Sequence, residues 1–337
     1  MRGGILVAYA IAPVLALAAC GDDGGAGGKG GGDSADVKIS LAHSYTEAQP
    51  QHRCGAQVIA DEVEKADVGM TVEVFAGSQL GGDADRISSV VSGDIDMDIQ
   101  GASALGAVYE PVSVLDAAYA FDDGEHLARY FDSDASTDLI EGFAKETGVH
   151  TLGAWSAGMR QFTANQPIRT PDDLDGLRMR FPNSPQFLMN AKALGADAVE
   201  VAYEELFLAL QQGTVDGQEN PIVNIAAISL DEVQDVISLS SHQANSNLVI
   251  IGEVWDELST EQQEVLQSAV NTAVDQVPGC VDDDEQKTLA EWEENGALEV
   301  VDDVEVDAFR TQVDAYLRDN FNEEQLAVYE GIRGTAE

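Results

Sequence analysis

Two arginines in the middle of the chain, Arg160 and Arg180, are the residues whose type and spacing best fit a chemical task. The chain has only 17 Lys plus Arg against 61 Asp plus Glu, so a cation at a predicted strand end is conspicuous. A guanidinium presents parallel N–H groups that match the two oxygens of a carboxylate. The pair therefore predicts a carboxylate-binding site. The alternative is that Arg180 pairs with a surface acid such as Asp175.

Both arginines follow segments with the pattern of strands. Residues 177–181 alternate and end before a proline, which cannot continue a sheet ladder, so Arg180 lies at a strand end. Arg160 follows an apolar, strand-like run at 151–155 and a glycine turn. Strand ends in α/β folds open into the loops that bind ligands. Two guanidiniums are therefore expected at one cleft.

Strand and helix signals alternate from residue 37 onward, which predicts an α/β fold. The expected strands are 37–43, 71–75, 177–181, 198–201, 215–221 and 247–251. The expected helices are 50–65, 83–92, 184–194 and 204–212, with a further helix from 260 to about 277. Thr260 is expected to cap this last helix, with Gln263 completing the capping box. Pro278 and Gly279 then break the helical pattern.

The first 36 residues have the composition of a signal and a tether. Residues 1–20 contain one positive charge and an apolar run of fifteen positions, Ile5 to Ala19, which is shorter than the roughly 20 that a membrane-spanning helix needs. A secretory signal peptide is expected. The ending Leu-Ala-Ala-Cys20 resembles a bacterial lipobox, in which Cys20 becomes the lipidated first residue; plain cleavage with an incidental Cys20 is the alternative. Residues 21–36, rich in Gly and Asp, are expected to be a flexible tether to the outer face of the cytoplasmic membrane.

The formal net charge of −44 excludes nucleic acids and anionic membrane surfaces as partners, because counterion release needs cationic side chains. With Cys20 lipidated, Cys54 and Cys280 remain as an even pair in an oxidising compartment, so a disulfide is their simplest use and two free thiols are the alternative. The five histidines show no metal-ligand spacing, and no G-x-S-x-G motif is present. Binding without a metal, a cofactor or catalysis is expected.

The motifs around both arginines resemble a known family. They are GMR at 158–160, GLRMRFPN at 176–183 and ALQQGTVDGQENP at 209–221, together with FAGSQLGGDADR at 75–86. Their letters and spacing are similar to those of the solute-binding receptors of TRAP (tripartite ATP-independent periplasmic) transporters, the DctP family. The resemblance extends from residue 37 to about residue 328.

This resemblance implies a two-lobed, periplasmic-binding-protein-like (type II) α/β fold with a central ligand cleft and hinge-crossing segments. Lobe I is expected to comprise 37–157 and 246–285, and lobe II 158–245 and 286–337. Family members tend to carry one long helix across both lobes, and Pro278 favours an interruption of that helix here.

The resemblance also implies a function and a site. A receptor of this family captures a small organic acid by hinge closure and delivers it to a small and a large membrane permease subunit; a monomer is expected. Arg180 would form a two-pronged salt bridge to the ligand carboxylate. The other expected site residues are Arg160, Asn220, Asn183, Tyr203, His43 and Tyr45. The alternatives are that Asn220 is only a turn residue and that Tyr203 only packs in the core.

The ligand class stays open between small dicarboxylates, sugar acids, hydroxy acids and aromatic acids. Sialic-acid receptors of the family carry an acidic residue where this chain has 100–103 (QGAS), so sialate is not expected. A metal-mediated mode for 2-oxo acids is not expected either, because it uses a different pattern around 218–220. Two other functions remain as alternatives: a ligand sensor of the same fold, and a secreted hydrolase.

Overall fold

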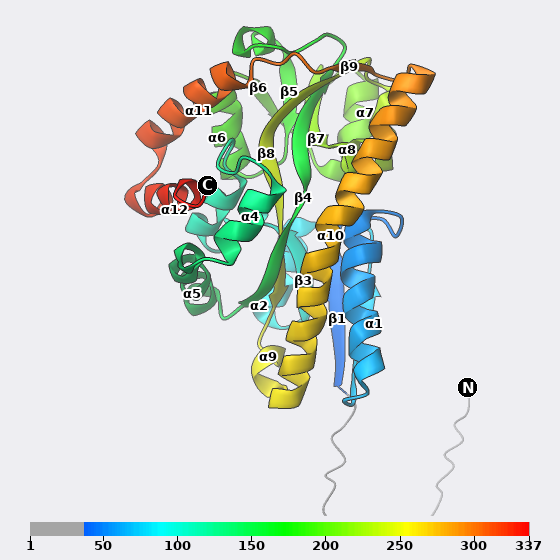
Figure 1. Cartoon of the computed structure of the whole chain (residues 1–337), viewed down its shortest axis with the longest axis vertical. Helices are drawn as coiled ribbons and strands as arrows, with labels where there is room; N and C mark the ends of the chain where they lie inside the picture. Colours follow the sequence, from blue (N-terminus) through cyan, green and yellow to red (C-terminus); the bar gives the residue numbers. More distant parts are fainter. Residues whose placement is uncertain (1–36, 337) are drawn as a thin grey trace, which may run out of the picture. The chain divides into compact units, whose positions relative to one another are not determined.

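The computed structural model describes residues 37–336, which belong to one compact unit built on a single nine-stranded sheet (Figure 1). The strand order is β2-β1-β3-β8-β4-β7-β5-β6, with β9 paired to β8. The strands are β1 Val37–His43, β2 Met70–Phe75, β3 Met97–Gly101, β4 His150–Ala164, β5 Arg178–Phe181, β6 Asp197–Glu200, β7 Gly217–Pro221, β8 Val236–Ile251 and β9 Glu299–Val301.

Helices cover the sheet, as the alternating strand and helix signals predict. They are α1 Gln57–Ala66, α2 Asp83–Ser92, α3 Ala102–Leu105, α4 Gly124–Phe131, α5 Thr137–Thr147, α6 Pro185–Leu194, α7 Leu206–Gln211, α8 Ile222–Ala227, α9 Val254–Glu257, α10 Thr260–Asn295, α11 Val306–Asn320 and α12 Glu323–Arg333. The predicted signal, tether and lipidated Cys20 lie outside the described residues. Within those residues, no helix is both long and apolar enough to span a bilayer.

Two long antiparallel strands, β4 and β8, connect the two halves of the sheet. One end of β8 pairs with β3, and the distal end of β4 pairs with β7. On one side of this pair lie the parallel strands β2, β1 and β3, and on the other side β7, β5 and β6. This arrangement fits two lobes joined by single crossing strands. The lobe boundaries stay a prediction, and α12, placed in lobe II by the sequence, packs against residues 110–116 and 134–136.

The β4–β8 ladder is irregular at its middle. Its register shifts between Ser156 and Met159 and again between Arg160 and Phe162. Gly158, inside the first irregularity, has a φ of +101°, which a residue with a side chain rarely adopts. A β-carbon there would also collide with the carboxylate of Glu285 on α10. Such bulges bend a strand and redirect its side chains, here at the position of Arg160.

Helix α10 contradicts the interruption predicted at Pro278, because it continues unbroken from Thr260 to Asn295. Its first part buries Leu266, Val270 and Val277 against α1 and β4, while Trp292 near its end packs in a separate apolar cluster. Packing along both parts outweighs the hydrogen bond that proline removes. The capping prediction was one residue off: Ser259 is the N-cap, and its partner in the capping box is Gln262.

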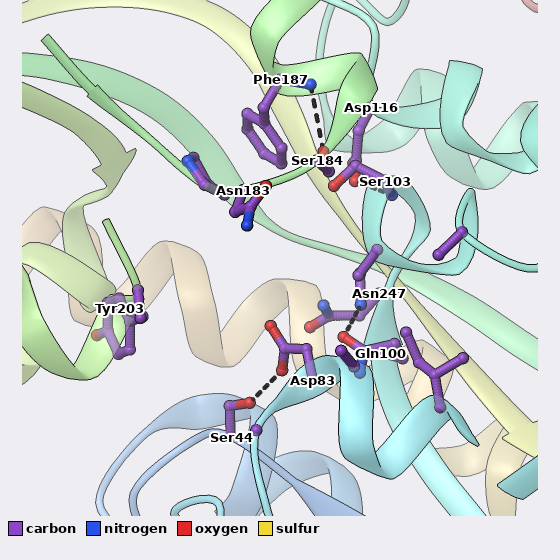
Figure 2. Close-up of a pocket in the computed structure, with 18 of the residues that line it drawn as sticks. Ser44, Asp83, Gln100, Ser103, Asp116, Asn183, Ser184, Phe187, Tyr203 and Asn247 are labelled. Atoms are coloured by element: carbon purple, nitrogen blue, oxygen red, sulfur yellow. Dashed lines mark hydrogen bonds between the residues drawn. The ribbon is translucent and has the colours of Figure 1, made fainter. Parts of the chain in front are cut away.

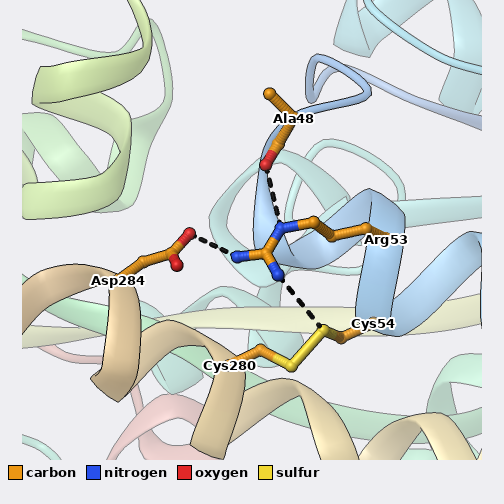
Figure 3. Close-up of a disulfide and its surroundings, with 5 residues drawn as sticks. All are labelled: Ala48, Arg53, Cys54, Cys280 and Asp284. Carbon is orange, nitrogen blue, oxygen red and sulfur yellow. Dashed lines mark hydrogen bonds and ion pairs between the residues drawn. A yellow bond between two sulfur atoms is a disulfide. The ribbon is translucent and has the colours of Figure 1, made fainter. Parts of the chain in front are cut away.

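A disulfide joins α10 to the segment before α1. The Sγ atoms of Cys54 and Cys280 are 2.08 Å apart, and the bridge links positions 226 residues apart in sequence (Figure 3). Arg53 lies over the bridge and donates to Asp284 at 2.5 Å and to the carbonyl of Ala48 at 3.0 Å. The link fixes the first part of α10 to the β1 side of the molecule.

Glu285 on α10 gives the fold a pH dependence. Its Oε1 is buried without a hydrogen-bond partner among the described residues. Burial, reinforced by the nearby carboxylate of Asp282, raises the pKa of Glu285 from its ordinary value of 4.5 to about 8. The unfolded chain therefore releases this proton near pH 4.5, whereas the folded protein retains it up to about pH 8. Ionisation of Glu285 thus favours the unfolded state increasingly as the pH rises through this window.

We expect Glu285→Gln to stabilise the protein by about 1–3 kcal/mol at pH 8 and to change its stability little at pH 4.5, because the amide removes only the ionisation. Denaturant unfolding of both proteins across this pH range measures the difference. Asp283→Asn, at an exposed position on the same helix, is the control and should show no such trend. A Glu285→Gln difference that stays constant with pH would contradict the assignment.

Candidate functional site

A cleft of about 560 Å³ lies where several strands end. Residues that line it follow the carboxyl ends of β1, β3 and β5 or end β7, while others come from the middle of β4 and β8. The lining residues used below are Ser44, Tyr45, Asp83, Asp85, Gln100, Ser103, Asp116, Arg160, Arg180, Asn183, Phe187, Tyr203, Glu204, Asn220, Asn224, Asn245 and Asn247. Strand ends are where α/β folds place ligand groups.

Arg180 is a buried cation that has no counter-ion among the described residues. Its side chain is placed by β5, which ends one residue later at Phe181, and the residue is 2 % exposed. Nε donates to the carbonyl of Val201 at 2.8 Å. Within residues 37–336 its Nη atoms have no hydrogen-bond partner and no carboxylate forms an ion pair with it. Burial lowers its pKa to about 10, so the group stays charged at neutral pH and lacks an anion.

Arg160 lines the same cleft, but a carboxylate already neutralises it. Its Nε and Nη2 donate to both carboxylate oxygens of Glu219 on the neighbouring strand β7, Nη2 at 2.8 Å. Nη1 donates to Asn245 at 2.6 Å, and Nη2 also reaches the amide oxygen of Asn220 at 3.1 Å. The guanidinium carbon lies 4.8 Å from the ring centre of Phe187. Arg160 is therefore a fixed hydrogen-bond donor with little net charge to offer.

The carboxylate of this ion pair also contacts a buried histidine, His242. Nε2 of His242 lies 3.3 Å from Glu219, and Nδ1 lies 2.8 Å from the hydroxyl of Ser240. Burial lowers the pKa of His242, with Glu219 partly opposing it, so the ring is neutral. A carboxylate only accepts, so Nε2 carries the proton and Nδ1 accepts from Ser240. Burial disfavours ionisation of Glu219, but Arg160 outweighs it and holds the pKa below its usual value.

Four other predicted residues line the cleft. Asn183 follows β5, and Figure 2 shows it at the edge of the open space. Tyr203 is placed on another wall, where its hydroxyl donates to the carbonyl of Asn224 at 3.1 Å. The hydroxyl of Tyr45 donates to Asn247 at 2.8 Å. Asn220 lines the cleft, and its amide nitrogen donates to Gln218 at 2.5 Å. What each contributes to ligand binding stays a prediction.

His43 is not in the cleft, contrary to the expectation from sequence. It ends β1, whose last three residues are all buried, and is 0 % exposed. Its Nε2 lies 3.1 Å from Nδ1 of His52, and its Nδ1 accepts from the backbone N–H of Tyr45 at 3.2 Å. Burial, followed by the neighbouring His52, lowers the pKa of His43 to about 3. His43 is a neutral packing residue, and the cleft lining begins at Ser44.

The alternative pairing of Arg180 with Asp175 does not occur. The strand neighbour Arg178 instead takes a surface acid, Asp216, with Nη2 and Oδ1 2.6 Å apart. The position along β5 explains this, because Arg178, the first residue of the strand, is exposed, whereas Arg180 near its end is buried.

Several lining residues were not expected from the sequence. Asn245 and Asn247 carry no motif that distinguishes them from other polar residues of the chain, and Asp83 lies in the 75–86 motif but was not singled out as a site residue. The position of Asp83 directly after the Gly81-Gly82 turn, as the first residue of α2, was the available signal. Within residues 37–336 no group of three or more His, Cys, Asp or Glu could hold a metal ion.

The sequence matches the family described as bacterial extracellular solute-binding protein, family 7 (DctP), over residues 41–324. It is 29% identical over 252 residues to the sialic acid-binding periplasmic protein SiaP of Vibrio cholerae, which covers 74% of this chain and 78% of that protein.

The fold is similar to solved structures of the same kind. A TRAP periplasmic solute binding protein from Roseobacter denitrificans with bound L-galactonate has a TM-score of 0.81 and 28% identity, covering 89% of this chain and 99% of that chain. One from Pseudomonas aeruginosa with bound L-malate has a TM-score of 0.77 and 28% identity, covering 84% of this chain and 99% of that chain. These similarities confirm the predicted two-lobed α/β fold and the predicted family.

Proposed function

The chain belongs to family 7 of the bacterial extracellular solute-binding proteins, the solute-binding receptors of TRAP transporters, and we propose that it captures a small organic acid in this cleft by closing around it. The observation that carries the proposal is Arg180, a buried guanidinium whose Nη atoms have no partner among the described residues. Burying an unpaired charge is costly, and a ligand carboxylate removes that cost with two charge-assisted hydrogen bonds.

The connections between the two halves support closure. β4 and β8 cross once each, with register shifts at Ser156–Met159 and Arg160–Phe162. The described part of the chain has ligand-facing side chains on both sides of this region, with Tyr45 and Asp83 on one side and Arg180 and Tyr203 on the other. A hinge at the irregular positions would bring these walls together on the ligand.

Delivery to a small and a large TRAP permease subunit completes the proposed role, with the receptor acting as a monomer. The family places the protein outside the cytoplasm. The lipobox-like ending at Cys20 supports attachment of the mature chain to the outer face of the cytoplasmic membrane by a lipid. The relatives are solute-binding proteins, and no catalytic role is proposed.

We expect the methyl ester of a bound acid to bind about 10- to 150-fold more weakly than the free acid, because the ester loses the charge-assisted hydrogen bonds to Arg180. Isothermal titration calorimetry of matched acids and esters measures this ratio. Small-angle scattering should show a smaller radius of gyration with the acid than with the ester at equal concentration. Equal affinity for an ester, or for a neutral sugar, would refute the carboxylate clamp.

A further inference from the structure

The charges that line the cleft are unbalanced. Two guanidiniums, Arg160 and Arg180, face four carboxylates, Asp83, Asp85, Asp116 and Glu204. Glu219 already neutralises Arg160 from behind. Within the described residues, Arg180 is thus the single lining cation without an acidic partner. One ligand carboxylate would neutralise Arg180, and a second carboxylate would have no unpaired cation in the lining to bind.

Asp83 places negative charge in the lining of the same cleft. Its Oδ1 accepts from the hydroxyl of Ser44 at 2.7 Å and from Nη2 of Arg86 at 2.9 Å. Its Oδ2 accepts no hydrogen bond in residues 37–336, and the side chain is 52% exposed. Figure 2 shows Asp83 across the open space from Asn183, which follows Arg180 in the chain by three residues. One carboxylate oxygen of Asp83 is therefore free to meet a ligand at the wall across from Asn183.

Arg86 does not cancel all the negative charge at this end of the cleft. The buried Nε of Arg86 also donates to both oxygens of Asp98, each at 3.2 Å. Burial raises the pKa of Asp98 to about 7, so Asp98 is only partly ionised at neutral pH. The negative charge that remains at this end comes from Asp85, which lines the cleft beside Asp83. The N-terminus of α2, which could attract an anion, already has Asp83 and Asp85 in its first turn.

The remaining polar lining is neutral. It consists mainly of amides and hydroxyls, including Asn183, Asn245, Asn247 and Ser103. Amides both donate and accept, so they match hydroxyl groups and offer no charge to a carboxylate. The Nδ2 of Asn245 is one such donor, since only its oxygen is engaged, by Arg160.

We infer that the cleft selects acids with one carboxylate and a hydroxylated remainder, and that Asp83 is the specificity-determining residue that accepts from a ligand hydroxyl and rejects a second carboxylate. The inference rests on the proposed function and narrows it. Repulsion of the wrong ligand is a common source of specificity, because bringing two like charges together at an interface is disfavoured. Small dicarboxylates are thereby excluded from the ligand classes that the sequence left open.

Matched sugar acids test the inference. L-galactonate and galactarate share their carbon chain and differ in one end group, a hydroxymethyl in the first and a carboxylate in the second. Erythronate with tartrate, and gluconate with glucarate, give further pairs, and succinate and L-malate represent simple dicarboxylates. In calorimetric titrations of the purified protein, the best-bound monoacid should have an affinity about 100-fold higher than that of its matched diacid. A diacid, succinate or malate that binds as tightly as the best monoacid would overturn the inference.

Variants assign the selectivity to Asp83. Asp83→Asn should reduce the ratio of monoacid affinity to diacid affinity at least tenfold, mainly because the diacid binds more tightly. Asp94→Asn, the same change at an exposed position just after α2, should leave the ratio as in the unaltered protein. An unchanged ratio in Asp83→Asn would also overturn the assignment. Should that variant fail to fold, the ratios of the unaltered protein still decide the ligand class.

The same titrations separate this inference from the proposed function. Tight diacid binding that disappears in Arg180→Ala would refute the selection and leave the carboxylate clamp intact. The absence of binding by every acid in the panel would contradict both.

Discussion

Arg180→Ala is expected to abolish binding of the acid while the protein stays folded. The guanidinium is 2 % exposed and has no carboxylate partner among the described residues, so its truncation removes an unpaired charge and leaves no orphaned acid behind. Removing one side of a buried charged contact with a ligand costs on the order of 2–5 kcal/mol. This is roughly a 30- to several-thousand-fold loss of affinity. Calorimetry with the best-bound acid measures the loss.

A matched control lies two residues away on the same strand. Arg178 is the exposed first residue of β5 and pairs with the surface acid Asp216, so Arg178→Ala should keep full affinity. Arg180→Lys should recover little, because an ammonium cannot reproduce two parallel hydrogen bonds. Near-normal affinity in Arg180→Ala, or equal losses in both alanine variants, would remove Arg180 from the site.

The sequence was sufficient to predict Arg180 because local features define its position. A short alternating segment that stops at Pro182 marks a strand end, and strand ends face ligands in α/β folds. The resemblance to a family supplied Tyr203 and Asn220, which the structure places in the cleft lining. Both kinds of signal lie within a few residues along the chain.

Signals that depend on partners distant in sequence were missed. The sequence shows Arg160 as a second cation, but its neutralisation by Glu219 follows from the pairing of β4 with β7, which places residues 59 apart in contact. The prediction for His43 was wrong for a similar reason: the last three residues of β1 are all buried, so alternation cannot show which side chain there meets the cleft. The net charge left for a ligand is therefore a property of the tertiary structure.

The helix that continues through Pro278 illustrates the same limit for the fold. Proline and glycine in succession are a sound local signal for a helix end. Apolar contacts before and after Pro278, and the disulfide at Cys280, hold α10 together in spite of it. Tertiary packing outweighs local propensity here, and the contacts responsible come from α1 and β4, which are distant in sequence.

Glu219→Ala should destabilise the protein by about 3–5 kcal/mol, because it leaves the guanidinium of Arg160 buried without its counter-ion. Arg160 Nε and His242 Nε2 would lose their acceptor, and Nη2 of Arg160 would keep only the Glu219 carbonyl and Asn220. Denaturant unfolding measures the change. Glu200→Ala, at an exposed position of β6, is the control and should alter stability by less than about 0.5 kcal/mol.

The double variant Arg160→Met with Glu219→Leu separates the ion pair from simple loss of packing. Replacing both charges by apolar side chains of similar volume removes the uncompensated charge, so the double variant should be more stable than Glu219→Ala. Losses that add without this recovery would show that the two side chains contribute independently. Higher stability of the double variant would show that Glu219 stabilises the fold by neutralising Arg160. Arg180 would then be the cleft arginine that is available to a ligand carboxylate.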